Sequence, residues 1–183
     1  VKNAKAIINL RNIIFSFKES LIIIVSAIDK TTNGLEDVWS FFVKGNTNDA
    51  IKKANETIEF HKSIIAELGL NSESEFLIFF KKLTQELLLF LSTGPKENDD
   101  FSYSKIVSFG ELFSTLIISS YLKKEGLKNR WIDARNLIKT SNQYLDSKVN
   151  WKETKIEINS IIDENITYVS QGFIGANQMR ETT

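Results

Sequence analysis

The chain has 183 residues, of which 42% are hydrophobic and 25% are charged, proportions typical of a soluble globular protein. This length suffices for one domain with a substantial core, or for a large piece of a bigger domain. The 23 basic residues are balanced by 23 acidic ones. Because there is no positive excess to attract a phosphate backbone, a nucleic-acid partner is disfavoured.

The sequence also predicts neither secretion nor a membrane span. It contains no cysteine, which excludes disulfides and thiolate metal sites and suits a reducing compartment such as the cytoplasm. The most apolar stretches, Leu21–Val25 and Leu87–Leu91, are far shorter than the roughly 18 residues that a membrane helix requires. Lys2 and Lys5 are not followed by a continuous apolar block, so we expect no signal peptide and no membrane partner.

The N-terminal region predicts a helix followed by a buried strand. Apolar residues recur at helical spacing across residues 2–17. The segment Leu21–Val25 is short, continuous and rich in β-branched residues, as expected for a strand that is buried on both faces of a sheet. A helix, a buried strand and then more helices indicate a layered α/β fold.

Three predicted strands are separated by helices, which favours a mostly parallel sheet with a helical insert at about 44–100. Glycine, proline, asparagine and aspartate together make residues 92–100 the clearest loop. Gly126 is the predicted end of the longest helix. The other predicted helices cover 33–43, 48–68 with Asn48 as the cap, 74–91, 103–124 and 153–162, and the other strands cover 129–134 and 166–175.

Two polar segments follow predicted strands. They are "SAIDKTTN" at 26–33 and "QGFIGANQMRETT" at 171–183. In open α/β sheets, ligands bind beyond the carboxyl ends of the strands, so parallel strands would bring both segments to one site. Ser26 and Thr32 carry hydroxyls that can bind a carboxylate or a phosphate. Thr32 also suits the N-cap of the next helix, and taken alone that interpretation is favoured.

The longest predicted helix carries a narrow polar stripe within an otherwise apolar surface. Ser104, Ser108, Glu111 and Thr115 follow one another at steps of four, three and four. A carboxylate buried there is costly unless a cation or hydrogen-bond donors meet it. Gly110 leaves room for a close approach. Glu111 therefore either receives a cationic substrate group, such as an amino-acid ammonium, or pairs with a structural lysine or arginine, and the residues alone leave both open.

The remaining polar candidates favour structural roles. His61 lies within a predicted helix and has no second histidine or cysteine to share a metal, so we expect a core histidine and no metal site. Asp133 and Arg135 suit an ion pair better than a place in the site. The two glycines of "QGFIG" match no complete nucleotide-binding fingerprint.

Four segments together resemble the successive motifs of aspartate kinases. In the family's order and at roughly its spacing, they are "SAIDKTTN" at 26–33, "SYSKIVSFGEL" at 102–112, "WIDAR" at 131–135 and "QGFIG" at 171–175. The likeness covers nearly the whole chain. It implies the amino-acid-kinase fold, a three-layer α/β/α sandwich. The implied reaction is transfer of the γ-phosphoryl of ATP to the β-carboxylate of L-aspartate, the first step toward lysine, threonine and methionine.

The resemblance also assigns substrate-binding residues by position. Glu111 matches the carboxylate that holds the amino group of aspartate, and Thr32 matches the threonine of the aspartate site. Ser26 matches the serine that opens the same loop, and Phe173 falls where the loop backbone meets the substrate. No catalytic residue is implied, because phosphoryl transfer is mostly positioning and a carboxylate nucleophile needs no general base.

Relative to the family, the chain resembles only the aspartate-binding, amino-terminal portion. Aspartate kinases begin with a strand and a Lys-Phe-Gly-Gly-Thr-Ser block, whose lysine stabilises the transferring phosphate, and they continue into a nucleotide-binding half and ACT domains. We therefore expect residues 1–183 to be one domain that is inactive alone. The resemblance implies that ATP with Mg²⁺ is bound mainly by segments outside this chain, and that the full-length enzyme is a homo-oligomer. Asp29 stands where glycine is usual, and Arg180 lies in a loop that often has glycine.

Two alternatives remain at this stage. The same fold could phosphorylate another small acid, such as glutamate. A different class of protein, a non-catalytic helical interaction module, could keep the fold only as a scaffold. Assays with both amino acids, and a titration of the intact protein with aspartate and nucleotide, would separate them.

Overall fold

The strands form a three-stranded parallel sheet, as the sequence predicts. The computed structural model describes residues 1–97 and 99–183 and orders the strands β1-β3-β2. Val25, the last residue of β1, pairs with Gln171, the last residue of β3. The two polar segments that follow these strands therefore leave the sheet side by side. The strands are β1 (Ile22–Val25), β2 (Asn129–Trp131) and β3 (Thr167–Gln171).

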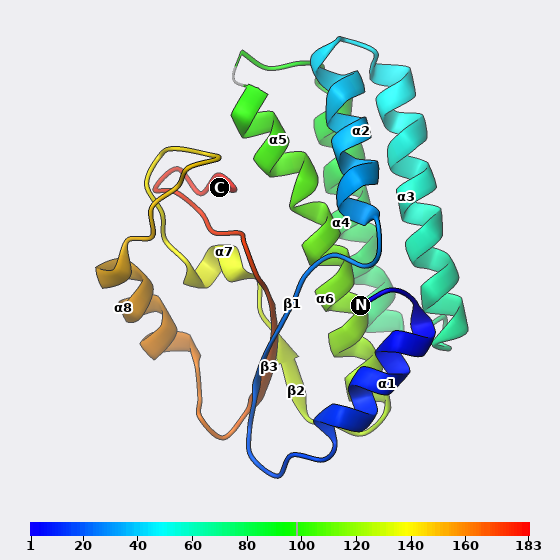
Figure 1. Ribbon diagram of the computed structural model, residues 1–183, viewed down its shortest axis with the longest axis vertical. Helices are drawn as coiled ribbons and strands as arrows, with labels where there is room; N and C mark the ends of the chain where they lie inside the picture. Colours follow the sequence, from blue (N-terminus) through cyan, green and yellow to red (C-terminus); the bar gives the residue numbers. More distant parts are fainter. Residues whose placement is uncertain (98) are drawn as a thin grey trace.

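Helices cover both sides of this sheet and make a three-layer arrangement. Figure 1 shows α1 to α6 on one side of the strands and α7 and α8 on the other. Of these helices, α6 contacts all three strands. The helices are α1 (Ala4–Ile14), α2 (Thr31–Val43), α3 (Thr47–Glu67), α4 (Ser74–Ser92), α5 (Asp99–Val107), α6 (Phe109–Lys124), α7 (Ala134–Leu137) and α8 (Trp151–Ile161).

Several predicted boundaries are wrong. The helix expected at 103–124 is two helices, α5 and α6, separated at Ser108. The strand expected at 129–134 ends at Trp131, because Asp133 caps α7: its Oδ1 accepts a hydrogen bond from the backbone N–H of Arg135 (3.0 Å). Helix α3 begins at Thr47 with Asn46 at its N-cap position, so Asn48 is not the cap. Residue 98, within the predicted loop, lies outside the described residues.

The expectation that the first strand is buried on both faces is also wrong. Ile22 and Ile24 are 60% and 57% exposed, whereas Ile23 and Val25 pack into the core. Successive side chains of a strand point to opposite faces. The core contains the face of β1 that carries Ile23 and Val25, while the opposite face of this edge strand is left open within the described part of the chain.

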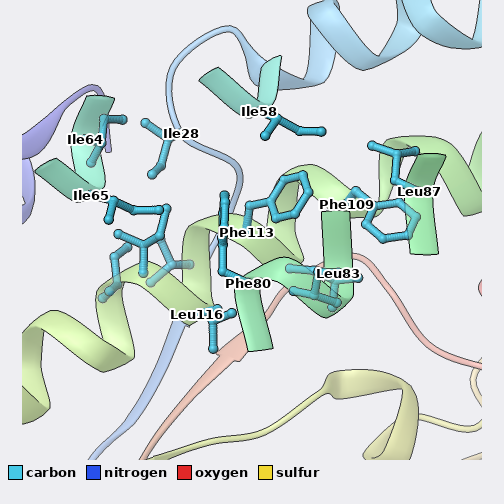
Figure 2. Close-up of a cluster of buried hydrophobic side chains, with 14 of the residues drawn as sticks. Ile28, Ile58, Ile64, Ile65, Phe80, Leu83, Leu87, Phe109, Phe113 and Leu116 are labelled. Carbon is cyan, nitrogen blue, oxygen red and sulfur yellow. The ribbon is translucent and has the colours of Figure 1, made fainter. Parts of the chain in front are cut away.

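The hydrophobic core lies between α3, α4 and α6. Figure 2 shows Phe113 of α6 near the centre of this cluster. Its ring contacts those of Phe80 (5.3 Å between centroids) and Phe109 (5.9 Å). The stretch Asp99–Lys124 is long and apolar enough to cross a membrane by length and composition, but 83% of its most apolar window is buried inside the fold. This stretch therefore forms the centre of the core, and α6 can place a side chain such as Glu111 well below the surface.

Candidate functional site

A cavity of about 450 Å³ opens beyond the carboxyl ends of β1 and β3. Ser26, Thr32, Glu111 and Phe173, the four site residues predicted from the sequence, all line it. They come from the loop after β1, the start of α2, the start of α6 and the loop after β3. The parallel strands thus bring together residues that are up to 147 positions apart in the chain, and the volume lies in the range of small-molecule sites.

The loop after β1 is held by contacts to its neighbours. The Ser114 hydroxyl of α6 donates to the Ser26 carbonyl (2.8 Å), and the backbone N–H of Asp29 donates to the Val1 carbonyl (2.9 Å). The interpretation of Thr32 as a helix cap is wrong. Helix α2 begins one residue earlier, at Thr31, with Lys30 at the N-cap position and no side-chain cap. Thr32 is therefore free of that role and lines the cavity.

Glu111 is a buried carboxylate at the cavity wall. Only 8% of its surface is exposed, and its Oε1 accepts a hydrogen bond from the backbone N–H of Ala27 (3.3 Å). None of the ion pairs formed between described residues involves Glu111. Burial raises its pKa, and hydrogen bonds from the backbone N–H groups of Glu111 itself and Ala27 oppose that rise. The structural lysine or arginine considered above is thus not found in the part of the chain that the structure describes.

Gly110 explains how Ala27 reaches Glu111. A Cβ at this position would lie 3.0 Å from the Cβ of Ala27 and 3.2 Å from Cγ2 of Thr31. These separations are tighter than ordinary contacts, so a larger residue would push the loop after β1 away from α6. The expected close approach is confirmed, and the segment that approaches is the protein's own loop.

Phe173 lies at the rim of the cavity in a strained backbone conformation. Its φ is 62° and its side chain is 95% exposed. Non-glycine residues rarely adopt positive φ, and such strain is often found at functional sites. Phe173 is thus largely exposed to solvent although it is among the residues that line the cavity.

Several lining residues, notably two tyrosines, were not predicted from the sequence. The Tyr103 hydroxyl of α5 donates to Glu36 Oε1 (2.8 Å), and burial, reinforced by Glu36, raises the pKa of Tyr103 to about 12. The Tyr144 hydroxyl donates to Glu181 Oε2 (2.7 Å). Tyr103 lies directly before the polar stripe and could have been found by extending it. Tyr144 follows no periodic pattern, so the sequence offered no signal for it.

Three of the four residues of the polar stripe line the cavity, and the fourth is buried outside the lining. Ser104, Ser108 and Glu111 line the cavity, as the stripe implied. Thr115, its fourth member, is fully buried and lies outside the cavity lining.

Two other candidates are structural, as expected. Arg135 binds Asp133 through two nitrogens, with Nε 2.9 Å from Oδ1 and Nη2 2.6 Å from Oδ2, and neither residue lines the cavity. His61 is fully buried, and its Nδ1 lies 2.8 Å from the Thr57 carbonyl. Burial lowers its pKa to about 4. His61 is therefore a core residue.

The fold and the motifs agree with comparisons to known proteins. The sequence profile of the Amino acid kinase family matches residues 1–181. The chain belongs to the amino acid kinase family. Among curated members, the aspartokinase of Chlamydia muridarum is 29% identical over 168 residues, which cover 88% of this chain and 34% of the relative. Aspartokinase 2, chloroplastic, of Arabidopsis thaliana is 35% identical over 139 residues, which cover 73% of this chain and 25% of the relative.

Solved structures show the same fold. E. coli aspartokinase III in complex with lysine and aspartate aligns with a TM-score of 0.85 at 18% identity, over 99% of this chain and 40% of that chain. The same enzyme in complex with aspartate and ADP aligns with a TM-score of 0.81 at 19% identity, over 99% and 40% of the two chains. The expected amino-acid-kinase fold is thus confirmed. The chain spans between about a quarter and a third of the length of the curated relatives it matches.

Proposed function

We propose that this chain is the aspartate-binding part of an aspartate kinase, which transfers the γ-phosphoryl of ATP to the β-carboxylate of L-aspartate and forms 4-phospho-L-aspartate. One observation carries the proposal. Glu111 is a buried carboxylate that faces a cavity and has no cationic partner among the described residues. The ammonium of an amino acid would supply the missing charge. The relatives named aspartokinase, and the E. coli enzyme that holds aspartate and ADP, support the choice of aspartate.

The chain's residues act by holding and orienting the substrate. Glu111 accepts hydrogen bonds from the substrate ammonium, and this ion pair is strengthened because the carboxylate is largely out of water. The hydroxyls of Ser26 and Thr32 donate to the substrate carboxylates. The β-carboxylate itself is the nucleophile and is already deprotonated at neutral pH, so no general base is needed. Correct orientation of this carboxylate is the main contribution of the site.

We assign no residue of this chain to the nucleotide or its metal. The described residues contain no group of three or more histidine, cysteine, aspartate or glutamate side chains that could hold a metal ion. In our proposal ATP binds with Mg²⁺ to the remainder of a longer protein. When bound, Mg²⁺ neutralises the phosphate charge during transfer. We further propose that the longer protein is a cytoplasmic homo-oligomer that serves lysine, threonine and methionine synthesis.

Residues 1–183 form a single structural unit in this proposal, with a helical insert at about 44–100. Helices α3 and α4 of the insert share one hydrophobic cluster with α6, the helix that carries Glu111. That shared cluster supports treating the insert as part of the same unit.

An assay of the full-length protein tests the proposal. ATP-dependent formation of an acyl phosphate is measured with L-aspartate and with L-glutamate as acceptors. We expect phosphorylation of aspartate, at least about 100-fold weaker phosphorylation of glutamate, and no activity from the 183-residue chain alone. Preference for glutamate would show a kinase for another acid. Absence of both activity and aspartate binding in the intact protein would favour an interaction module instead.

A further inference from the structure

A buried hydroxyl, one turn after Glu111 on α6, connects the helix to the ends of two strands. The Oγ1 of Thr115, which is fully buried, donates to the Glu111 carbonyl (2.8 Å). It also accepts hydrogen bonds from Gln171 Nε2 (2.6 Å) and from Trp131 Nε1 (2.9 Å). A hydroxyl has one proton and two acceptor lone pairs, so these three bonds use its full capacity. A threonine on a helix commonly bonds only the carbonyl one turn before it, and the two strand contacts are therefore the unusual feature.

Gln171 extends this connection to the other wall of the cavity. It is the last residue of β3 and is 3% exposed. Its side-chain carbonyl accepts the backbone N–H of Ala134 (2.7 Å), while its amide donates to Thr115. Both ends of the side chain are thus fixed, and the backbone passes directly into the loop 172–175 that carries Phe173. The bond between Thr115 and Gln171 therefore ties the helix of Glu111 to that loop.

The strain at Phe173 shows why such an anchor matters. A non-glycine residue at φ 62° persists only where its surroundings hold the backbone in place. The Phe173 ring is almost wholly in solvent and provides little packing. On the far side, Gly175 and Thr183 exchange two backbone hydrogen bonds (3.0 and 3.2 Å). On the near side, the two hydrogen bonds of the Gln171 side chain fix the start of the loop.

We propose that Thr115 and Gln171 are positioning residues, whose hydrogen bond sets the spacing between Glu111 and the loop 172–175 across the cavity. The identity of the affected substrate rests on the proposed function, whereas the spacing itself does not. Loss of the bond lets the loop relax away from α6. The amino-acid substrate then loses contacts on one side, while a nucleotide bound elsewhere keeps its own.

Four variants of the full-length protein test this role. Thr115→Val removes the hydroxyl and its bonds to Gln171 and Trp131. Gln171→Met removes the whole amide, and with it the bonds to Thr115 and Ala134. Thr115→Ser keeps the hydroxyl. Thr57→Val is the matched control, because the Thr57 hydroxyl bonds the Lys53 carbonyl of its own helix (3.3 Å) in the same way but reaches no strand. We expect Thr115→Val and Gln171→Met to raise the KM for aspartate about tenfold, with the KM for ATP changed less than about twofold. Thr115→Ser should retain the wild-type KM for aspartate, and Thr57→Val should leave it unchanged.

A second readout does not depend on the substrate. Hydrogen exchange of the backbone amides in the loop 172–175 is measured on the folded variants. We expect about tenfold faster exchange in Thr115→Val and Gln171→Met, and no change in Thr57→Val. The effect of the double variant should be smaller than the sum of the two single effects, because both substitutions remove the bond between Thr115 and Gln171. Unaltered loop exchange, or equal rises in both KM values, would overturn the proposal. If the wild-type enzyme did not phosphorylate aspartate, the proposed function would be refuted. The hydrogen-exchange data would still decide whether Thr115 and Gln171 position the loop.

Discussion

Glu111 and His61 are both ionisable and buried, and both are carried by helices of one core, but their surroundings differ. Glu111 lies at the wall of a cavity. His61 is enclosed by the rings of Phe60 and Phe113 (5.4 and 5.2 Å between centroids), and its Nε2 has no hydrogen-bond partner within the described chain. Burial favours the neutral form of each, because it raises the pKa of Glu111 and lowers that of His61 to about 4.

The comparison shows that burial of an ionisable group does not by itself mark a site. A buried charge lowers stability in both places. Of these two residues, Glu111 lines a cavity and His61 lines none of those found among the described residues, so a bound ligand can supply the opposite charge only at Glu111. The cavity, and not the pKa shift, therefore separates a binding group from a core group.

The largest expected effect is a pH dependence of stability caused by His61. Its pKa is about 4 in the folded chain, against 6.5 for an ordinary histidine, so the unfolded chain binds the proton more tightly. The contribution of neutral His61 to the free energy of unfolding is fully present above pH 6.5 and is lost as the pH falls toward 4. At about 1.4 kcal/mol per pKa unit, the loss amounts to about 3 kcal/mol. Urea unfolding at several pH values measures it.

Two controls isolate this effect. His61→Phe removes the titrating group and should flatten the stability profile between pH 6.5 and 4. Because the chain contains a single histidine, its imidazole signals in NMR titrations belong to His61 alone. A titration near 6.5 in the folded protein would contradict the burial of His61 and the comparison drawn from it.

Glu111→Gln should weaken aspartate binding while it stabilises the fold. Hydrogen bonds to a charged group contribute about 1.5–3 kcal/mol, so we expect affinity to fall about 10- to 100-fold. The pKa of Glu111 is raised, so its favourable contribution is present below pH 4.5 and is lost as the pH rises through the folded value. Removal of the charge should therefore raise the free energy of unfolding at pH 7 by about 0.5–2 kcal/mol. Calorimetric titration and urea unfolding of the intact protein measure the two effects.

Glu86→Gln provides the matched control. Glu86 of α4 pairs with Lys105 (2.5 Å from Oε1 to Nζ) and lies outside the cavity lining. Its replacement should leave aspartate affinity unchanged and should not stabilise the fold, because this carboxylate already has a cationic partner. If Glu86→Gln and Glu111→Gln behaved alike, the special position of Glu111 would be refuted.

The sequence predicted those features that depend on local pattern. The polar stripe around Glu111, the parallel strands and the two loops at their carboxyl ends were all found in this way. Features that depend on distant packing were not. The exposed face of Ile22 and Ile24 could not be inferred, because a continuous apolar strand looks the same whether one face or both are covered. Tyr144 lines the cavity and its hydroxyl donates to Glu181, 37 residues later, and no local pattern reveals such a contact.

The smallest expected effect concerns residues with strained backbone, which can also be compared according to whether they line the cavity. Phe173, Asp29 and Arg180 all have positive φ (62°, 51° and 62°), but only Phe173 lines the cavity. The resemblance places glycine at or near the other two positions, and the structure gives the reason, because a residue without Cβ adopts this conformation without steric cost.

Arg180→Gly should raise the free energy of unfolding by about 0.5–1 kcal/mol, whereas Arg180→Ala keeps the Cβ and should not. Neither variant should alter aspartate affinity. If Arg180→Gly did alter aspartate affinity, backbone strain outside the cavity would also contribute to binding. Position at the cavity would then not separate binding residues from the others.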